Sequence, residues 1–148
     1  MLYRSLLLSF LLIMALQVIQ AGDGTSMSER EEMTGTGPVA IVYYFYTTQR
    51  CPSCLKIEKF TKETMETEFS SELKDGTIVF KMVNTDKTEN EHFIEDFELY
   101  TKSVVLVQPE GDKVIRWKNL PRIWQLLNDP PGFSKYIATE LAAFMGED

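Results

Sequence analysis

The sequence predicts an α/β sandwich built on a mixed β-sheet, with the element order β-α-β-α-β-β-α. Two observations lead to this fold class. Apolar runs of strand length alternate with segments whose apolar residues recur at helical spacing, and a Pro-Glu-Gly-Asp turn signal separates the last two strands. Helices that join parallel strands cover a sheet, whereas a closing hairpin adds antiparallel strands. We therefore expect one folded domain over residues 38–148.

The first strand and the first helix flank a pair of cysteines. Residues 39–46 (VAIVYYFY) form an apolar run rich in β-branched and aromatic types, which is typical of a central strand buried on both faces. Cys51-Pro-Ser-Cys54 follows that strand. A helix reaching about Phe69 is then predicted by residues at helical spacing, namely Ile57, Phe60, Thr64 and Met65.

A second strand and a second helix follow Gly76, which breaks the chain. Residues 77–83 (TIVFKMV) predict the strand, and Asn84, Thr85 and Asp86 offer capping side chains for the helix. The apolar face of that helix is expected to consist of Phe93, Ile94, Phe97 and Tyr100.

The last part of the domain reads as a hairpin followed by helices. Residues 103–108 and 113–118 are predicted strands around the turn 109–112. Residues 119–128 predict a short helix, and the Pro-Pro-Gly sequence at 130–132 interrupts the chain. A closing amphipathic helix is then expected, with its apolar face formed by Phe133, Ile137, Leu141 and Phe144.

Residues 1–21 have the layout of a secretory signal peptide, and residues 22–37 that of a flexible linker. Arg4 precedes an apolar run from Leu6 to Leu16, and Ala21 offers a small residue for cleavage. The run is shorter than the roughly 20 apolar residues of a membrane-spanning helix, although an uncleaved N-terminal anchor is the alternative. Both interpretations predict an extracytoplasmic domain, either periplasmic or secreted, which the anchor would tether to the membrane.

Composition excludes several function classes. The chain has 15 Lys+Arg and 22 Asp+Glu, a net charge of −7, which makes it a poor candidate for binding nucleic acid. Two cysteines and one histidine are too few for a self-contained zinc finger, an iron–sulfur cluster or a multi-disulfide scaffold. There is no Gly-rich dinucleotide fingerprint after a strand. We therefore expect no metal and no cofactor other than a disulfide.

The chemistry is predicted to reside in Cys51 and Cys54. A helix N-terminus stabilises a thiolate, and the adjacent Arg50 adds a cation. Pro52 suits the first helical turn, which Ser53 continues. We assign Cys51 as the nucleophile and Cys54 as the resolving thiol of thiol–disulfide exchange through a mixed disulfide.

Two alternatives to redox chemistry remain open. A structural disulfide is one, although a bridge at this spacing closes a small loop and removes little chain entropy. The domain would then be an interaction module. The other is a binding subunit that holds a metal or an arsenical without turnover, because a pair of nearby thiols also chelates trivalent arsenic.

The strand, the CPSC sequence at a helix start and the element order resemble a thioredoxin-like domain over residues 38–148. Three segments also resemble the ArsF-type family, described as nitrophenyl compound nitroreductase subunits. They are VYYFYTTQRCPSCLKIE, NTDKTENEHFIEDFELYTKSVVLV and RWKNLPRIWQLL. This resemblance implies a role in reducing nitroaromatic compounds or arsenicals. A dithiol supplies two of the six electrons that take a nitro group to an amine. We therefore expect an electron-carrying subunit with a protein redox partner, either a membrane thiol transporter or a reductase subunit.

The sequence departs from thioredoxin at three places near the cysteines. Arg50 stands where thioredoxins have Trp, and Phe45, six residues before Cys51, stands where they bury an Asp. The loop before the third strand lacks the cis proline of thioredoxins, so Lys102 or Ser103 is expected to face the dithiol instead. A lysine there would favour the thiolate further. A trans peptide is expected, because a cis bond before a residue other than proline is costly.

Overall fold

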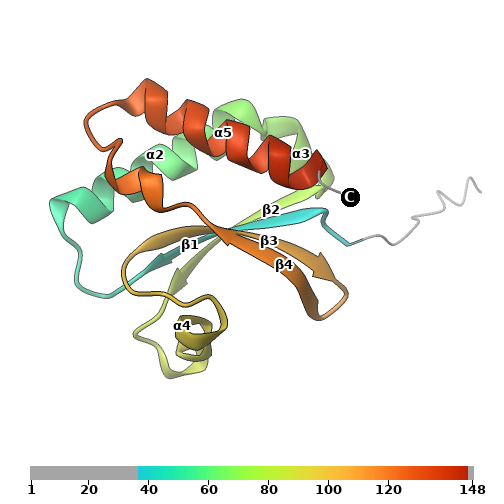
Figure 1. The fold of residues 1–148 in the computed structure, drawn as a ribbon, viewed down its shortest axis with the longest axis horizontal. Coiled ribbons are helices and arrows are strands. Elements are labelled where there is room, and N and C mark those ends of the chain that lie inside the picture. The colour runs from blue at the N-terminus through green and yellow to red at the C-terminus, as the bar shows by residue number, and fades with distance from the viewer. Residues whose placement is uncertain (1–36, 147–148) are drawn as a thin grey trace, which may run out of the picture. The chain divides into compact units, whose positions relative to one another are not determined.

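The computed structural model describes residues 37–146, in which a four-stranded mixed sheet lies between helices (Figure 1). The elements are β1 (Ala40–Tyr46), α2 (Pro52–Glu68), α3 (Ser70–Asp75), β2 (Ile78–Asn84), η2 (Thr88–Asn90), α4 (His92–Asp96), β3 (Ser103–Glu110), β4 (Lys113–Asn119), η3 (Pro121–Trp124) and α5 (Pro130–Gly146), where η marks a short 3₁₀ helix. The predicted signal peptide and, except for Gly37, the predicted linker lie outside the described residues.

The sheet has the strand order β2-β1-β3-β4. Strand β1 pairs in parallel with β2 and antiparallel with β3, and β3 pairs antiparallel with β4. Helices α2 and α3 lie between the parallel strands β1 and β2 in the chain, and the antiparallel strands β3 and β4 form a hairpin. The predicted α/β fold class, with its mixed sheet and thioredoxin-like element order, is confirmed.

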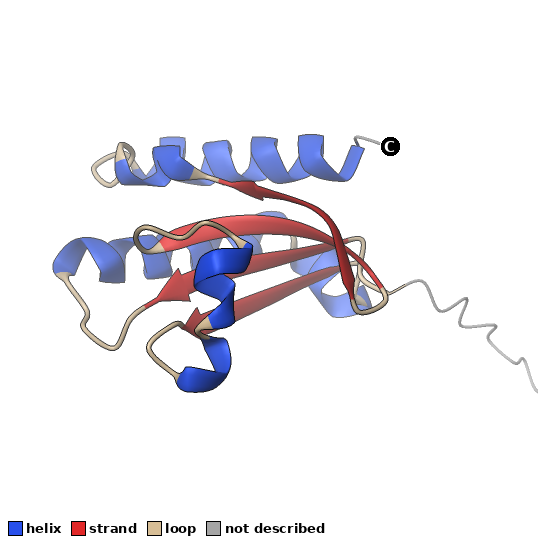
Figure 2. Ribbon diagram, turned by 60° about the horizontal axis from the view of Figure 1, so that its bottom comes forward, coloured by secondary structure: helices blue, strands red, loops and turns tan. Residues whose placement is uncertain are grey.

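Two apolar cores lie on the two faces of the sheet, because successive strand side chains point to opposite sides. On one face, Tyr44 and Leu106 pack with side chains of α2 and α5. On the other, Phe45 and Val105 pack with Phe97, just after α4. Figures 1 and 2 show this layering, with α2 and α5 over one face and α4 on the other. Strand β1 contributes side chains to both cores, and the CPSC sequence follows its end.

The elements around the first strand differ slightly from the predicted ones. Strand β1 begins at Ala40 rather than Val39, whose residue surface is 44% exposed. Strand β2 begins and ends one residue later than predicted. The short helix α3 was not predicted. It ends at Gly76, whose φ of +81° lies in the left-handed region that glycine tolerates.

The second predicted helix is much shorter than expected. Its predicted capping residues act elsewhere: the Asn84 side chain accepts the Asp86 N–H (3.0 Å), and the Asp86 carboxylate accepts the Thr48 N–H (2.7 Å). Helix α4 therefore starts without a side-chain cap and spans five residues. Of the four residues predicted for its apolar face, Phe97 is buried and Phe93 half-buried. Ile94 is exposed, and Tyr100 lies beyond the helix and is 94% exposed.

The hairpin and the closing helix are both present, with shifted boundaries. The strands of the hairpin extend to Glu110 and Lys113, so the turn is confined to Gly111 and Asp112, with Gly111 at a φ of +59°. Within 119–128, only the 3₁₀ helix η3 forms. The Pro-Pro-Gly sequence begins α5 instead of interrupting the chain, and the predicted apolar face of that helix is buried as expected.

Candidate functional site

Cys51 and Cys54 form a disulfide at the N-terminus of α2, with their Cα atoms 5.0 Å apart. Cys51 is the N-cap residue, has an extended backbone and is exposed, whereas Cys54 is fully buried one turn into the helix. The backbone N–H of Cys54 donates to Sγ of Cys51 at 3.2 Å. The sulfur that a partner can reach is therefore the one toward which a helix-terminal amide points.

The local sequence accounts for this first helical turn. Pro52 occupies the first helical position, where the missing N–H of proline has no intrahelical partner to lose. The N–H of Leu55 donates to the carbonyl oxygen of Cys51 (3.0 Å), which closes the turn. Ser53 is half-buried between the cysteines, whereas Leu55 is exposed. The helix N-terminus thus directs its partial positive charge at Sγ of Cys51.

Arg50 precedes the disulfide and is held by two contacts. Its guanidinium forms an ion pair with the carboxylate of Glu58 on α2. The same group lies over the ring of Tyr46, 4.3 Å from its centroid. Glu58 therefore partly neutralises the positive charge of Arg50. The stabilisation of the Cys51 thiolate that the sequence predicts for Arg50 is weakened to the same extent.

Tyr44 contacts the dithiol turn directly; the sequence places it in the core and the rim near the dithiol but does not predict this contact. Its hydroxyl donates to the carbonyl oxygen of Cys54 at 2.9 Å, and the residue is fully buried. Burial raises the pKa of Tyr44 to about 12, against a smaller opposing effect of the Arg50 charge. Phe45, the residue compared with the buried Asp of thioredoxins, lies in the core on the opposite face of the sheet.

The loop before β3 contains Lys102 and Ser103, and all peptide bonds in residues 37–146 are trans, as expected for this pair. Ser103 is buried, and its hydroxyl donates to the carbonyl oxygen of Thr101 (2.9 Å). The carbonyl oxygen of Lys102 accepts the indole N–H of Trp124 (3.1 Å), which fixes the loop against η3. That either residue faces the dithiol stays a prediction.

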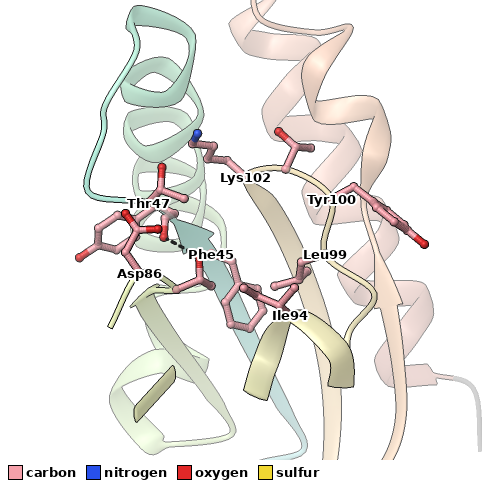
Figure 3. A pocket seen from close by; sticks show the side chains of 10 residues that line it. Phe45, Thr47, Asp86, Ile94, Leu99, Tyr100 and Lys102 are labelled. Atoms are coloured by element: carbon pink, nitrogen blue, oxygen red, sulfur yellow. Dashed lines mark hydrogen bonds between the residues drawn. The ribbon is translucent and has the colours of Figure 1, made fainter. Parts of the chain in front are cut away.

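Figure 3 shows the Lys102 side chain at a hollow of about 250 Å³ where β1 and β2 end and β3 begins. Phe45 and Leu99 form part of its apolar lining, and Asp86 adds a carboxylate. The chain leaves this end of β1 through Thr47 to reach Cys51. The hollow and the disulfide therefore lie at the ends of the same loop.

Two features are absent from residues 37–146. No three His, Cys, Asp or Glu side chains of this part of the chain come together as a metal site would require. Nor does any of its helices have the length and apolar character needed to cross a membrane.

Comparisons with known proteins give only distant structural likenesses. The chain matches no protein-family model and no curated protein. Among solved structures, a malarial protein is similar, with 17% identity and a TM-score of 0.40 over 66% of this chain and 94% of that one. A thioredoxin from Thermus thermophilus shows 14% identity and a TM-score of 0.35, covering 60% and 71%. The class of protein is therefore defined by the topology and the site: a thioredoxin-like α/β domain with a disulfide at a helix N-terminus.

Proposed function

We propose that this chain is an extracytoplasmic thiol–disulfide oxidoreductase that acts through Cys51 and Cys54. The observation that carries the proposal is the contrast between the two bonded sulfurs. One belongs to an exposed N-cap residue and accepts a helix-terminal N–H, whereas the other belongs to a fully buried residue. Catalytic dithiols need one accessible thiolate and one sheltered thiol that resolves the mixed disulfide.

The exchange balances without any further cofactor. In the reducing direction, the Cys51 thiolate attacks a disulfide sulfur of the partner, which releases the partner's other sulfur as a thiolate and forms a mixed disulfide. The Cys54 thiolate then attacks Sγ of Cys51, which releases the partner's second thiolate and forms the Cys51–Cys54 bond. Two electrons pass from this chain to the partner, and the reverse sequence oxidises a partner dithiol.

The narrower parts of the proposal rest on the sequence. The signal-like residues 1–21 support an extracytoplasmic location. The three segments that resemble the ArsF-type family support a subunit that carries electrons in the reduction of nitroaromatic compounds or arsenicals. Since one dithiol transfers two electrons per cycle, such a subunit requires a protein partner, either a membrane thiol transporter or a reductase subunit. A trivalent arsenical is a second ligand that the reduced dithiol could take.

Trapping the mixed disulfide tests this function. Cys54→Ser removes the resolving thiol, so the variant should accumulate joined to its partner through Cys51 when isolated from intact cells by acid quenching. Cys51→Ser is the matched control, because the buried Cys54 should trap little or nothing. Recovery of both variants only as free chains would contradict the oxidoreductase. If the reduced wild-type chain then binds one arsenite per chain, the function is that of an arsenical-binding subunit.

A further inference from the structure

We infer that Tyr44 is a positioning residue that sets the redox balance of the Cys51–Cys54 pair by holding the peptide group between Cys54 and Leu55. This inference rests on the proposed function, since a redox balance matters only if the pair cycles. It assigns a specific role to a residue that the sequence predicts only as part of the core and of the rim near the dithiol.

A chain of hydrogen bonds leads from Tyr44 to Cys51. The Tyr44 hydroxyl donates to the carbonyl oxygen of Cys54 (2.9 Å). The N–H of Leu55 belongs to the same peptide group and donates to the carbonyl oxygen of Cys51 (3.0 Å). Hydrogen bonds in series polarise one another, so a donor at one end of this peptide group strengthens the N–H at the other end. The phenol thereby tightens the turn that places the Cys54 N–H against Sγ of Cys51.

The Tyr44 side chain, which donates the first of these hydrogen bonds, is held rigidly. Tyr44 lies in the central strand β1, where its backbone pairs with Met82 of β2 on one side and with Val104 of β3 on the other. Its side chain is fully buried, and its ring stacks on that of Tyr46 with the centroids 5.9 Å apart. One hydroxyl group thus ties the first turn of α2 to a strand that is paired on both sides.

The Tyr44 hydroxyl remains a hydrogen-bond donor at every pH at which the thiols titrate. Because burial raises the pKa of Tyr44 to about 12, the group stays protonated and donates throughout the range in which thiols titrate. It can therefore orient the turn in both redox states without exchanging a proton with either cysteine. Loss of the donor should loosen the turn, weaken the N–H contact with the Cys51 thiolate and destabilise the reduced form relative to the disulfide.

The test compares Tyr44→Phe with Tyr43→Phe in the otherwise unchanged chain. Both variants lose one hydroxyl from neighbouring residues of β1, but the Tyr43 side chain lies in the core on the other face of the sheet. Equilibration with glutathione redox buffers gives the equilibrium constant of the pair, and the ultraviolet absorbance of the thiolate gives the pKa of the Cys51 thiol. Tyr44→Phe should shift the constant toward the disulfide at least about threefold, or ~14 mV, and raise that pKa. Tyr43→Phe should change neither.

A gain-of-function variant keeps the test decisive if Tyr44→Phe folds poorly. A fluorinated tyrosine at position 44 has a more acidic hydroxyl and donates a stronger hydrogen bond, so it should move both quantities the opposite way. Unchanged values in both Tyr44 variants, or equal shifts in Tyr43→Phe, would overturn the inference. The wild-type constant, measured in the same series, separately tests the proposed function: a pair as hard to reduce as a structural disulfide would remove the function itself.

Discussion

At the scale of residues, the different roles of the two cysteines follow from their positions. Cys51 caps a helix and is exposed, whereas Cys54 is enclosed one turn later. The CxxC spacing and the preceding buried strand were enough to predict this arrangement, because a helix start after a strand places its first residue at the surface and its fourth toward the core. The hydrogen bond of Tyr44 could not be predicted in the same way. The comparison with thioredoxins draws attention to the residue six positions before Cys51, which is Phe45 and not Tyr44.

Arg50 and Glu58 provide a test of the charges around Cys51. Because the two side chains form an ion pair, their effects on the reduced site should be opposite in sign. Arg50→Gln should raise the pKa of the Cys51 thiol and Glu58→Gln should lower it, each by less than about one pH unit, since both groups are partly exposed. The pH dependence of Cys51 alkylation measures this pKa.

Lys59→Gln is the matched control for that experiment. Lys59 is an exposed cation of the same helix that pairs with Glu63 at 3.8 Å. Its removal should leave the Cys51 titration unchanged. If Arg50→Gln and Glu58→Gln shift the titration in the same direction, the two side chains do not act on the thiolate through their charges.

At the scale of elements, the sequence predicts the order well and some of the boundaries poorly. The central strand and the closing helix were found because their apolar patterns are long. The second helix was overestimated because the predicted capping side chains bond elsewhere: that of Asn84 accepts the backbone N–H of Asp86, and the carboxylate of Asp86 accepts the backbone N–H of Thr48. Helix α5 was taken to start too late, since a Pro-Pro-Gly sequence interrupts a helix but is compatible with its first turn.

The start of α5 depends on one carboxylate. Asp129 accepts the N–H of Gly132 at 3.0 Å, which satisfies an otherwise unpaired amide of the first turn. A side chain at Gly132 would collide with that carboxylate, so the glycine allows the close approach. Asp129→Ala should lower the free energy of unfolding by about 1 kcal/mol in urea titrations.

Asp129→Asn keeps the acceptor oxygen and should lose only a few tenths of a kcal/mol, roughly the spread among good capping residues. The comparison separates the hydrogen bond from the charge of the carboxylate. Equal losses in the two variants would mean that the charge, not the cap, stabilises this end of the helix.

At the scale of the whole molecule, the sheet places one buried strand between two cores and the disulfide just beyond its end. The fold class could be predicted because strand and helix patterns alternate along the sequence. Which core receives each β1 side chain could not, since the whole strand is apolar and its alternation carries no polar signal. For the same reason the contact between Tyr44 and the Cys54 carbonyl became visible only when α2 was seen to lie over one face of the sheet.

The central claim is that the Cys51–Cys54 disulfide cycles, and its reduction potential tests that claim most directly. The measurement uses the purified chain equilibrated with glutathione or dithiothreitol buffers, with the oxidised and reduced fractions quantified by alkylation and mass spectrometry. Catalytic pairs of this kind have potentials of about −120 to −270 mV, and we expect a value within that range. A potential below about −300 mV, which is typical of structural disulfides, would contradict the account.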